Sequence, residues 1–126
     1  MKTENLWALV SKGERNLLVS TLFQELLYVT KDSNYERLKA LLAHAFSIEF
    51  SDRQSGWWGE YALWQGGDEL SIKLFPNFVA GEGFHEEKKR EYPYLLEITG
   101  KGDLCDIHER ILSLPTELEL IRRETF

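Results

Sequence analysis

The stretch YPYLLEITGKGDLCDIHERILSLPTELELIRR, residues 92–123, decides the fold. It predicts a strand over residues 92–98, a helix over 103–114 with Asp103 as its N-cap, and a second strand over 117–123. Apolar side chains on both faces of the first strand are typical of a strand that is covered on both sides. The apolar residues of the helix recur at steps of three and four: Leu104, Ile107, Ile111 and Leu114. Because the helix crosses between two strands of one sheet, we expect a parallel pair with a right-handed connection.

Two further helices are predicted upstream of this unit. Ser11 and Glu14 have the spacing of a capping box, and the leucine-rich segment behind them predicts a helix over residues 12–29. Ser33 and Glu36 form a second such box, followed by a helix over residues 34–45. The short polar turn between the two helices predicts a helical hairpin.

The middle of the chain reads as β-structure. Apolar residues alternate with polar ones over 46–50, which predicts a strand, and the polar residues 51–56 are expected to form a loop. Residues 57–64 and 69–75 flank a glycine pair, Gly66-Gly67, and therefore predict a β-hairpin. The second arm of the hairpin has three apolar residues on one face: Leu70, Ile72 and Leu74. Residues 76–90 form a long connection, and connections of that length are usually functional or mobile.

These elements add up to a single α+β domain over residues 1–126. We expect an N-terminal helical hairpin followed by a mixed sheet of about five strands, with the C-terminal β-α-β unit completing it. The chain has one cysteine, so no internal disulfide can form, and this fits a reducing compartment. We expect no signal peptide and no membrane span, and hence a cytoplasmic protein.

The charge balance narrows the class of partner. The net charge is −6, which argues against nucleic acid and against anionic membranes, because both attract clustered lysine and arginine. A basic protein partner is compatible with this charge, since an acidic surface would steer it in. The simpler interpretation is that the charge only keeps a small protein in solution.

No stretch has the pattern of a catalytic, metal or cofactor site. Cys105 and His108 share a helix face, but a zinc site needs three or four ligands and the acidic neighbourhood disfavours a thiolate. His85 and Glu86 begin a pattern like that of metalloproteases, but Lys89 stands where the second histidine is required. The glycine pairs lack the continuation that a phosphate-binding loop requires. We therefore predict a protein that is not an enzyme.

Aromatic anchors bordered by carboxylates are the remaining functional pattern, and they suit the binding of a basic protein. They lie in the predicted hairpin turn and in the long connection. The candidate partner-binding residues are Trp64, Asp68, Glu69, Phe78, Glu82, Phe84, Glu86 and Glu87. The sequence leaves open whether Trp57, Trp58 and Trp64 belong to the core or to an interface.

Four segments carry a resemblance to a known group of proteins. They are residues 58–64, 74–77, 94–98 and 118–124. In size, order of elements and acidity the chain resembles the small immunity proteins of bacterial polymorphic toxin systems, including those of contact-dependent inhibition. The resemblance implies a non-catalytic inhibitor that binds a cognate toxin, which is expected to be basic and could be a nuclease. The alternative is a homodimeric structural or adaptor module, paired through a sheet edge or through the helix over 12–29.

Overall fold

The computed structural model describes residues 22–67 and 69–126. The capping box at Ser11 and the first part of the helix predicted over 12–29 lie outside these residues. The predicted binding residue Asp68 lies outside them as well.

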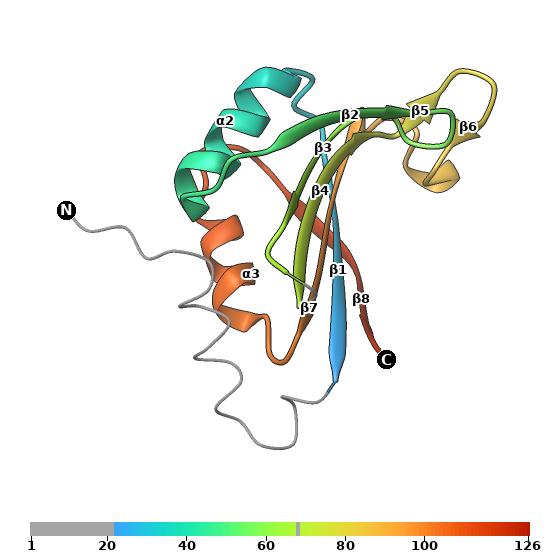
Figure 1. Cartoon of the computed structure of the whole chain (residues 1–126). Helices are drawn as coiled ribbons and strands as arrows, with labels where there is room; N and C mark the ends of the chain where they lie inside the picture. Colours follow the sequence, from blue (N-terminus) through green and yellow to red (C-terminus); the bar gives the residue numbers. More distant parts are fainter. Residues whose placement is uncertain (1–21, 68) are drawn as a thin grey trace.

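A six-stranded sheet forms the body of the protein, with the strand order β2-β3-β4-β7-β1-β8 (Figure 1). Each neighbouring pair in this sheet is antiparallel. The strands are β1 (Phe23–Thr30), β2 (Ser51–Ser55), β3 (Gly59–Gln65), β4 (Leu70–Pro76), β7 (Tyr94–Lys101) and β8 (Glu119–Thr125). The predicted mixed sheet of about five strands is therefore wrong.

Strand β1 overturns the predicted N-terminal helical hairpin. Residues 22–29 were predicted to end a helix, but Phe23–Thr30 is a strand between β7 and β8. Leu26 and Tyr28 face one side of the sheet, while Leu27 and Val29 face the other, and all four are buried. A strand buried on both faces has a continuous apolar run, and such a run has the same appearance as part of a buried helix.

The C-terminal β-α-β unit exists, but its two strands are not neighbours. β7 and β8 both pair antiparallel with β1, so they run parallel to each other with β1 between them. The predicted parallel pair is thus replaced by two antiparallel pairs. The sequence could not show this because the inserted strand comes from the other end of the chain.

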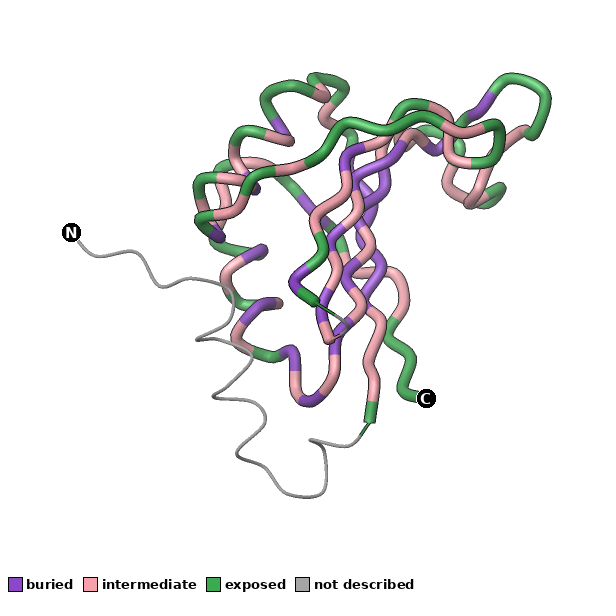
Figure 2. The backbone as a smooth tube through the Cα atoms, in the orientation of Figure 1, coloured by how far each residue is buried: buried purple, intermediate pink, exposed green. Residues whose placement is uncertain are grey.

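Two α-helices within the described residues, α2 (Tyr35–Phe46) and α3 (Cys105–Leu112), lie on the same side of the sheet (Figure 1). They bury the main core against the inner strands, where the purple segments gather in Figure 2. The helices contribute five core residues: Leu38, Leu42, Phe46, Ile107 and Ile111. Neither helix is long and apolar enough to cross a membrane.

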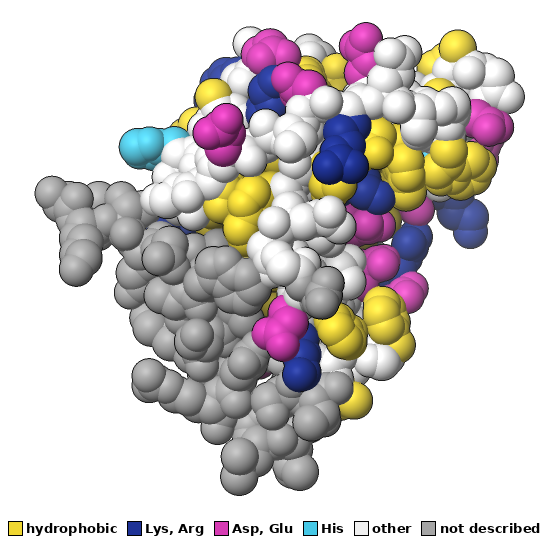
Figure 3. Space-filling model, viewed as in Figure 1, with side chains coloured by type: hydrophobic (Ala, Val, Ile, Leu, Met, Phe, Trp, Pro, Cys, Tyr) yellow, Lys and Arg dark blue, Asp and Glu magenta, His cyan; other side chains and the backbone are white. Residues whose placement is uncertain are grey.

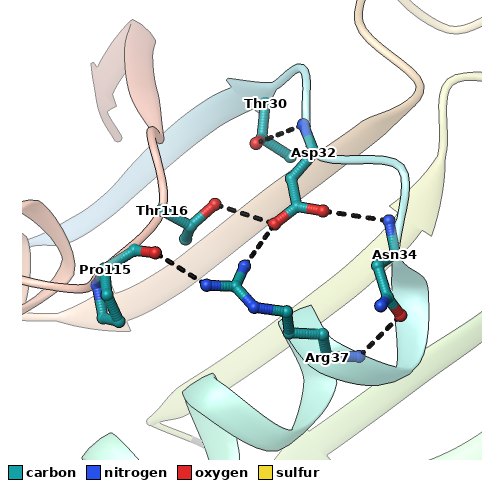
Figure 4. A network of polar contacts seen from close by, with 6 residues as sticks. All are labelled: Thr30, Asp32, Asn34, Arg37, Pro115 and Thr116. Carbon is teal, nitrogen blue, oxygen red and sulfur yellow. Dashed lines mark hydrogen bonds and ion pairs between the residues drawn. The ribbon is translucent and has the colours of Figure 1, made fainter.

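The beginning of α2 is held by a polar network (Figure 4). The Asn34 side chain caps the helix by accepting a hydrogen bond from the Arg37 amide at 3.1 Å. The Asp32 carboxylate accepts hydrogen bonds from the Asn34 amide, the Arg37 guanidinium and the Thr116 hydroxyl, at 3.0, 2.6 and 3.0 Å. Arg37 also donates to the carbonyl of Pro115 at 2.9 Å. The network therefore ties α2 to the segment that leads into β8.

The start of β-structure after α2 differs from the prediction. The strand predicted over 46–50 is absent, since Phe46 ends α2 and the next strand is β2 at Ser51–Ser55. Ser51 to Gln54 are exposed, so β2 has no apolar pattern that a sequence could reveal. It becomes a strand by pairing with β3 at the edge of the sheet. The β3–β4 hairpin was predicted correctly, including the buried face of Leu70, Ile72 and Leu74.

The sheet face opposite the helices carries a second, smaller apolar cluster. Its buried members come from three neighbouring strands: Leu27, Val29, Phe75 and Leu95. Half-buried aromatic side chains, among them Trp58 and Tyr92, pack over them. Trp58 directly precedes β3, and Tyr92 lies two residues before β7. The cluster therefore extends to the end of the sheet at which β3 and β7 begin and β4 ends.

Candidate functional site

The predicted long connection is an ordered structure organised around one buried polar residue. It contains the two-stranded pair β5 (Phe78–Val79) and β6 (Gly83–Phe84) and a 3-10 turn at Glu87–Lys89. Asn77 is 1% exposed. Its side-chain nitrogen donates to the carbonyls of Lys89 and Tyr92 at 2.8 and 3.0 Å, and its side-chain oxygen accepts from the Glu86 amide at 2.9 Å.

The main chain of Asn77 also forms hydrogen bonds with this segment. Its amide donates to the Pro93 carbonyl and its carbonyl accepts from the His85 amide, both at 2.8 Å. One asparagine therefore joins the beginning, middle and end of residues 77–93. A buried polar group satisfied in this way fixes the path of the chain around it.

Aromatic rings pack this segment against the end of the sheet. The His85 ring is stacked on Trp58, with centroids 5.1 Å apart, and meets Trp57 and Phe75 at 5.2 and 5.3 Å. The Lys73 ammonium lies 3.5 Å from the centroid of the Trp58 ring. Such a cation–π contact holds both partners in place. Trp58 is thus a packing residue. The sequence had left open whether it belongs to the core or to an interface.

The imidazole of His85 lies among three aromatic rings. Its Nε2 atom is buried and has no hydrogen-bond partner among the described residues. Burial lowers the pKa of the imidazole from its ordinary value of 6.5. The neutral ring therefore fits its aromatic surroundings best.

The surface of this end of the molecule carries exposed apolar side chains. Trp57 and Phe78 are each 55% exposed. The Phe78 ring packs against Phe84 with centroids 5.1 Å apart. In Figure 3, hydrophobic side chains gather at the end that carries β5 and β6. We call Trp57, Phe78, Glu82 and Phe84 the loop-end surface.

Carboxylates near this surface differ in how far their charge is compensated. The Glu86 carboxylate accepts a hydrogen bond from Arg122 at 2.8 Å, and Glu87 is paired with Arg90. Glu82 is exposed in the β5–β6 turn and forms no ion pair with any residue that the structure describes. The charge of Glu86 is thus compensated within the protein by Arg122, while the carboxylate of Glu82 is available to a partner.

Seven of the eight predicted binding residues lie in the part of the chain that the structure describes, and they do not form one surface. Five of them lie in the long connection, within or next to the β5–β6 pair: Phe78, Glu82, Phe84, Glu86 and Glu87. Trp64 and Glu69 lie at the other end of β4, beside the β3–β4 turn. β4 has seven residues, and at about 3.3 Å per residue this separates the two groups by roughly 20 Å. Trp64 packs against the main core, and Glu69 is paired with Lys101 at 3.7 Å.

A groove beside the loop-end surface was not predicted. It has a volume of about 490 Å³ and lies between the start of α2, the β2–β3 turn and the segment after β4. Its walls include Tyr35, Glu60, Phe78 and Tyr94. These residues are far apart in the sequence, so no local pattern could have joined them.

Cys105 and His108, which the sequence analysis considered as a metal or catalytic site, form hydrogen bonds within the fold. Cys105 is exposed, and hydrogen bonding to the Asp103 carboxylate raises the pKa of its thiol. The Nδ1 atom of His108 lies 2.7 Å from the hydroxyl of buried Tyr28. Over residues 22–67 and 69–126, no group of three or more His, Cys, Asp or Glu residues has the arrangement of a metal site.

Comparison of the chain with protein-family models, with curated proteins and with solved structures gave no match. The residues and their geometry therefore carry the functional argument.

Proposed function

We propose that this chain is a non-catalytic binding protein that inhibits a cognate basic protein by occupying one of its surfaces. The observation that carries the proposal is the loop-end surface, where Phe78 is exposed beside the uncompensated carboxylate of Glu82. Aromatic side chains, phenylalanine included, are enriched at the cores of protein interfaces. Neighbouring carboxylates select a basic partner.

The rigidity of this surface also supports a role in binding. Asn77 fixes the segment that presents Phe78 and Glu82, and the Trp58–His85 stack fixes its position on the sheet. A surface ordered before binding loses less conformational entropy when the partner docks. The net charge of −6 would further accelerate the encounter with a basic protein.

Within this proposal, the partner is a toxin and the chain is its immunity protein. That assignment follows from the resemblance in size, acidity and order of elements. A basic nuclease would suit the charge of the chain. The site of action would be the cytoplasm, where a free exposed thiol such as that of Cys105 stays reduced.

A homodimer is the second candidate, and the exposed edge of the sheet favours it. β2 is an edge strand with four exposed residues, Ser51 to Gln54, so its outer backbone groups are open to pairing with another strand. Two copies could join their sheets along this edge. Sedimentation at micromolar concentration tests this candidate, because a clean monomer would remove it.

The experiment that tests the proposal is affinity capture from a lysate of the native host. The tagged chain is washed at low and then at high salt, and bound proteins are identified by mass spectrometry. We expect one stoichiometric basic partner that is released by salt. A Phe78→Ser variant should capture much less of it, whereas Glu69→Gln, at the other end of β4, should capture the same amount. Equal capture by both variants would show that the partner does not use the loop-end surface.

A further inference from the structure

Two adjoining hollows lie along β2, next to the start of α2. Their volumes are about 490 and 390 Å³, and they share Tyr35, Gln54 and Glu60 as lining residues. The first hollow extends to Phe78 and Tyr94, and the second extends to Asp52 and Arg53. Since Phe78 also belongs to the loop-end surface, the first hollow is continuous with that surface.

Aromatic rings form the wall of the first hollow. The rings of Tyr35 and Tyr94 are tilted by 36° with centroids 5.5 Å apart. The faces of tyrosine rings attract cations. The protein already uses this property here, because the Lys39 ammonium lies 5.4 Å from the Tyr35 centroid. Because Lys39 lies against Tyr35, a cation from outside would contact this wall chiefly at Tyr94, over whose ring no cation of the described residues lies.

The charges around the hollows leave one carboxylate without a partner. Lys39 is paired with Glu36 at 3.2 Å and with Asp52 at 2.9 Å, so these two carboxylates are compensated. Glu60 is exposed and forms no ion pair within the part of the chain that the structure describes. Of the described residues that line the first hollow, Glu60 is the one that carries a charge.

The strand register shows which way the charged side chains point. Glu60 lies two residues before Ala62, which is buried in the main core, so both face the helix side of the sheet. Arg53 pairs with Tyr61 and therefore faces the other side. The pKa of Tyr94 is raised first by burial and then by the negative charge of Glu60, which agrees with a carboxylate near that hydroxyl.

We propose that the first hollow receives an arginine side chain of the binding partner, with Glu60 as its counter-ion and the rings of Tyr35 and Tyr94 as its walls. A guanidinium group suits this hollow better than an ammonium group because it is planar, stacks on aromatic faces and pairs with a carboxylate through two donors. This inference rests on the proposed function and specifies the chemistry of the partner at one point.

The probe for this inference is the peptide N-acetyl-Gly-Arg-Gly-amide, titrated into the ¹⁵N-labelled full chain and followed by amide chemical shifts. The matched control peptide carries citrulline, which has nearly the same shape as arginine but no charge. We expect saturable shifts around Ser55, Gly59 and Glu60 with the arginine peptide and none with the citrulline peptide. Equal shifts with both peptides, or none around the hollow with either, would overturn the inference.

Two variants of the protein sharpen the test. Glu60→Gln should weaken binding of the arginine peptide roughly 1.5- to fivefold, the range expected for one exposed ion pair. Glu109→Gln is the matched control, because Glu109 is also exposed, lies on α3 and lines neither hollow, and it should leave the affinity unchanged. An unchanged affinity for Glu60→Gln would contradict the role of this carboxylate.

Failure of this inference is distinguishable from failure of the proposed function. If affinity capture finds a basic partner that is lost with Phe78→Ser, and the purified partner binds Glu60→Gln as tightly as the wild type, the partner uses the loop-end surface and the hollow is not its arginine site. If the arginine peptide binds the hollow but no basic partner is captured, the hollow is real and the inhibitor proposal is wrong.

Discussion

Replacement of Asn77 by alanine should release the segment that carries the loop-end surface. The substitution removes three side-chain hydrogen bonds, to the Glu86 amide and to the carbonyls of Lys89 and Tyr92. At about 1 kcal/mol of net stabilisation for each bond, the segment should lose about 3 kcal/mol of local stability. Because 1.4 kcal/mol corresponds to a factor of about ten, amide exchange through local opening should become roughly a hundredfold faster.

Hydrogen exchange at selected amides measures this loss directly. The amides of His85 and Tyr92 are suitable reporters, because they donate to backbone carbonyls of Asn77 and Lys89 and do not touch the Asn77 side chain. We expect much faster exchange at both, and a smaller change at the buried residues of β1. Asn77→Asp should be at least as disruptive, since it would place a carboxylate against two carbonyl oxygens.

Asn34→Ala provides the matched control, with the same substitution at an exposed helix cap. It removes one bond, from the Arg37 amide, and should cost about 1 kcal/mol without changing exchange over residues 77–93. Unchanged exchange at His85 and Tyr92 in Asn77→Ala would refute the reasoning. It would mean that the aromatic contacts around Trp58 hold the segment without the asparagine.

Three further predictions concern the stability of the fold. Hydrogen bonding by the Asn34 amide lowers the pKa of Asp32 below 3.8. The ionised carboxylate therefore stabilises the fold above that pH, and this stabilisation is lost as the pH falls through the folded-state pKa. Asp32→Asn should remove this pH dependence from the free energy of unfolding, as measured by denaturant unfolding. Burial lowers the pKa of His85 below 6.5, so unfolding should become easier as the pH falls below that value, and His85→Gln should flatten the profile measured from about pH 8 to about pH 5. Gly100→Ala would place a methyl group 2.8 Å from Leu70 and 2.9 Å from Leu104, and should lower the free energy of unfolding by about 1–3 kcal/mol; an unchanged denaturation midpoint would show that both leucines can move aside.

The parts of the fold that the sequence predicted are those with a local pattern. Leu70, Ile72 and Leu74 alternate with polar residues around a glycine turn, and they form the buried face of a hairpin strand. α2 was expected over residues 34–45 and spans Tyr35–Phe46, because the capping polar residues and the apolar stripe both lie within the segment itself. Predictions of this kind need no knowledge of distant partners.

The parts that failed depend on partners far away in the chain. Leu26 to Val29 are apolar on all sides, and only their place between β7 and β8 makes them a strand. Ser51 to Gln54 have no apolar residue and become a strand by pairing with β3. For the same reason, the sequence grouped Trp64 and Glu69 with the long connection, although β4 holds the two regions apart.

The candidate site was predicted in part. Phe78, Glu82 and Phe84 were singled out from the sequence, and they do lie together around the β5–β6 pair. The role of Asn77 could not be foreseen, because an asparagine in a polar loop gives no sign that it will be buried. The hollow lined by Tyr35, Glu60 and Tyr94 could not be foreseen either, since three separate elements build it.

The most direct test of the central claim is the affinity of the purified, captured partner for the wild-type chain and for two variants, measured by isothermal titration. Phe78→Ser removes the exposed aromatic ring and should weaken binding at least tenfold, because a fully buried phenylalanine contributes roughly 1.5–3 kcal/mol. Glu69→Gln should bind like the wild type. If no partner is captured, or if Phe78→Ser binds as tightly as the wild type, the loop-end surface is not where this protein acts.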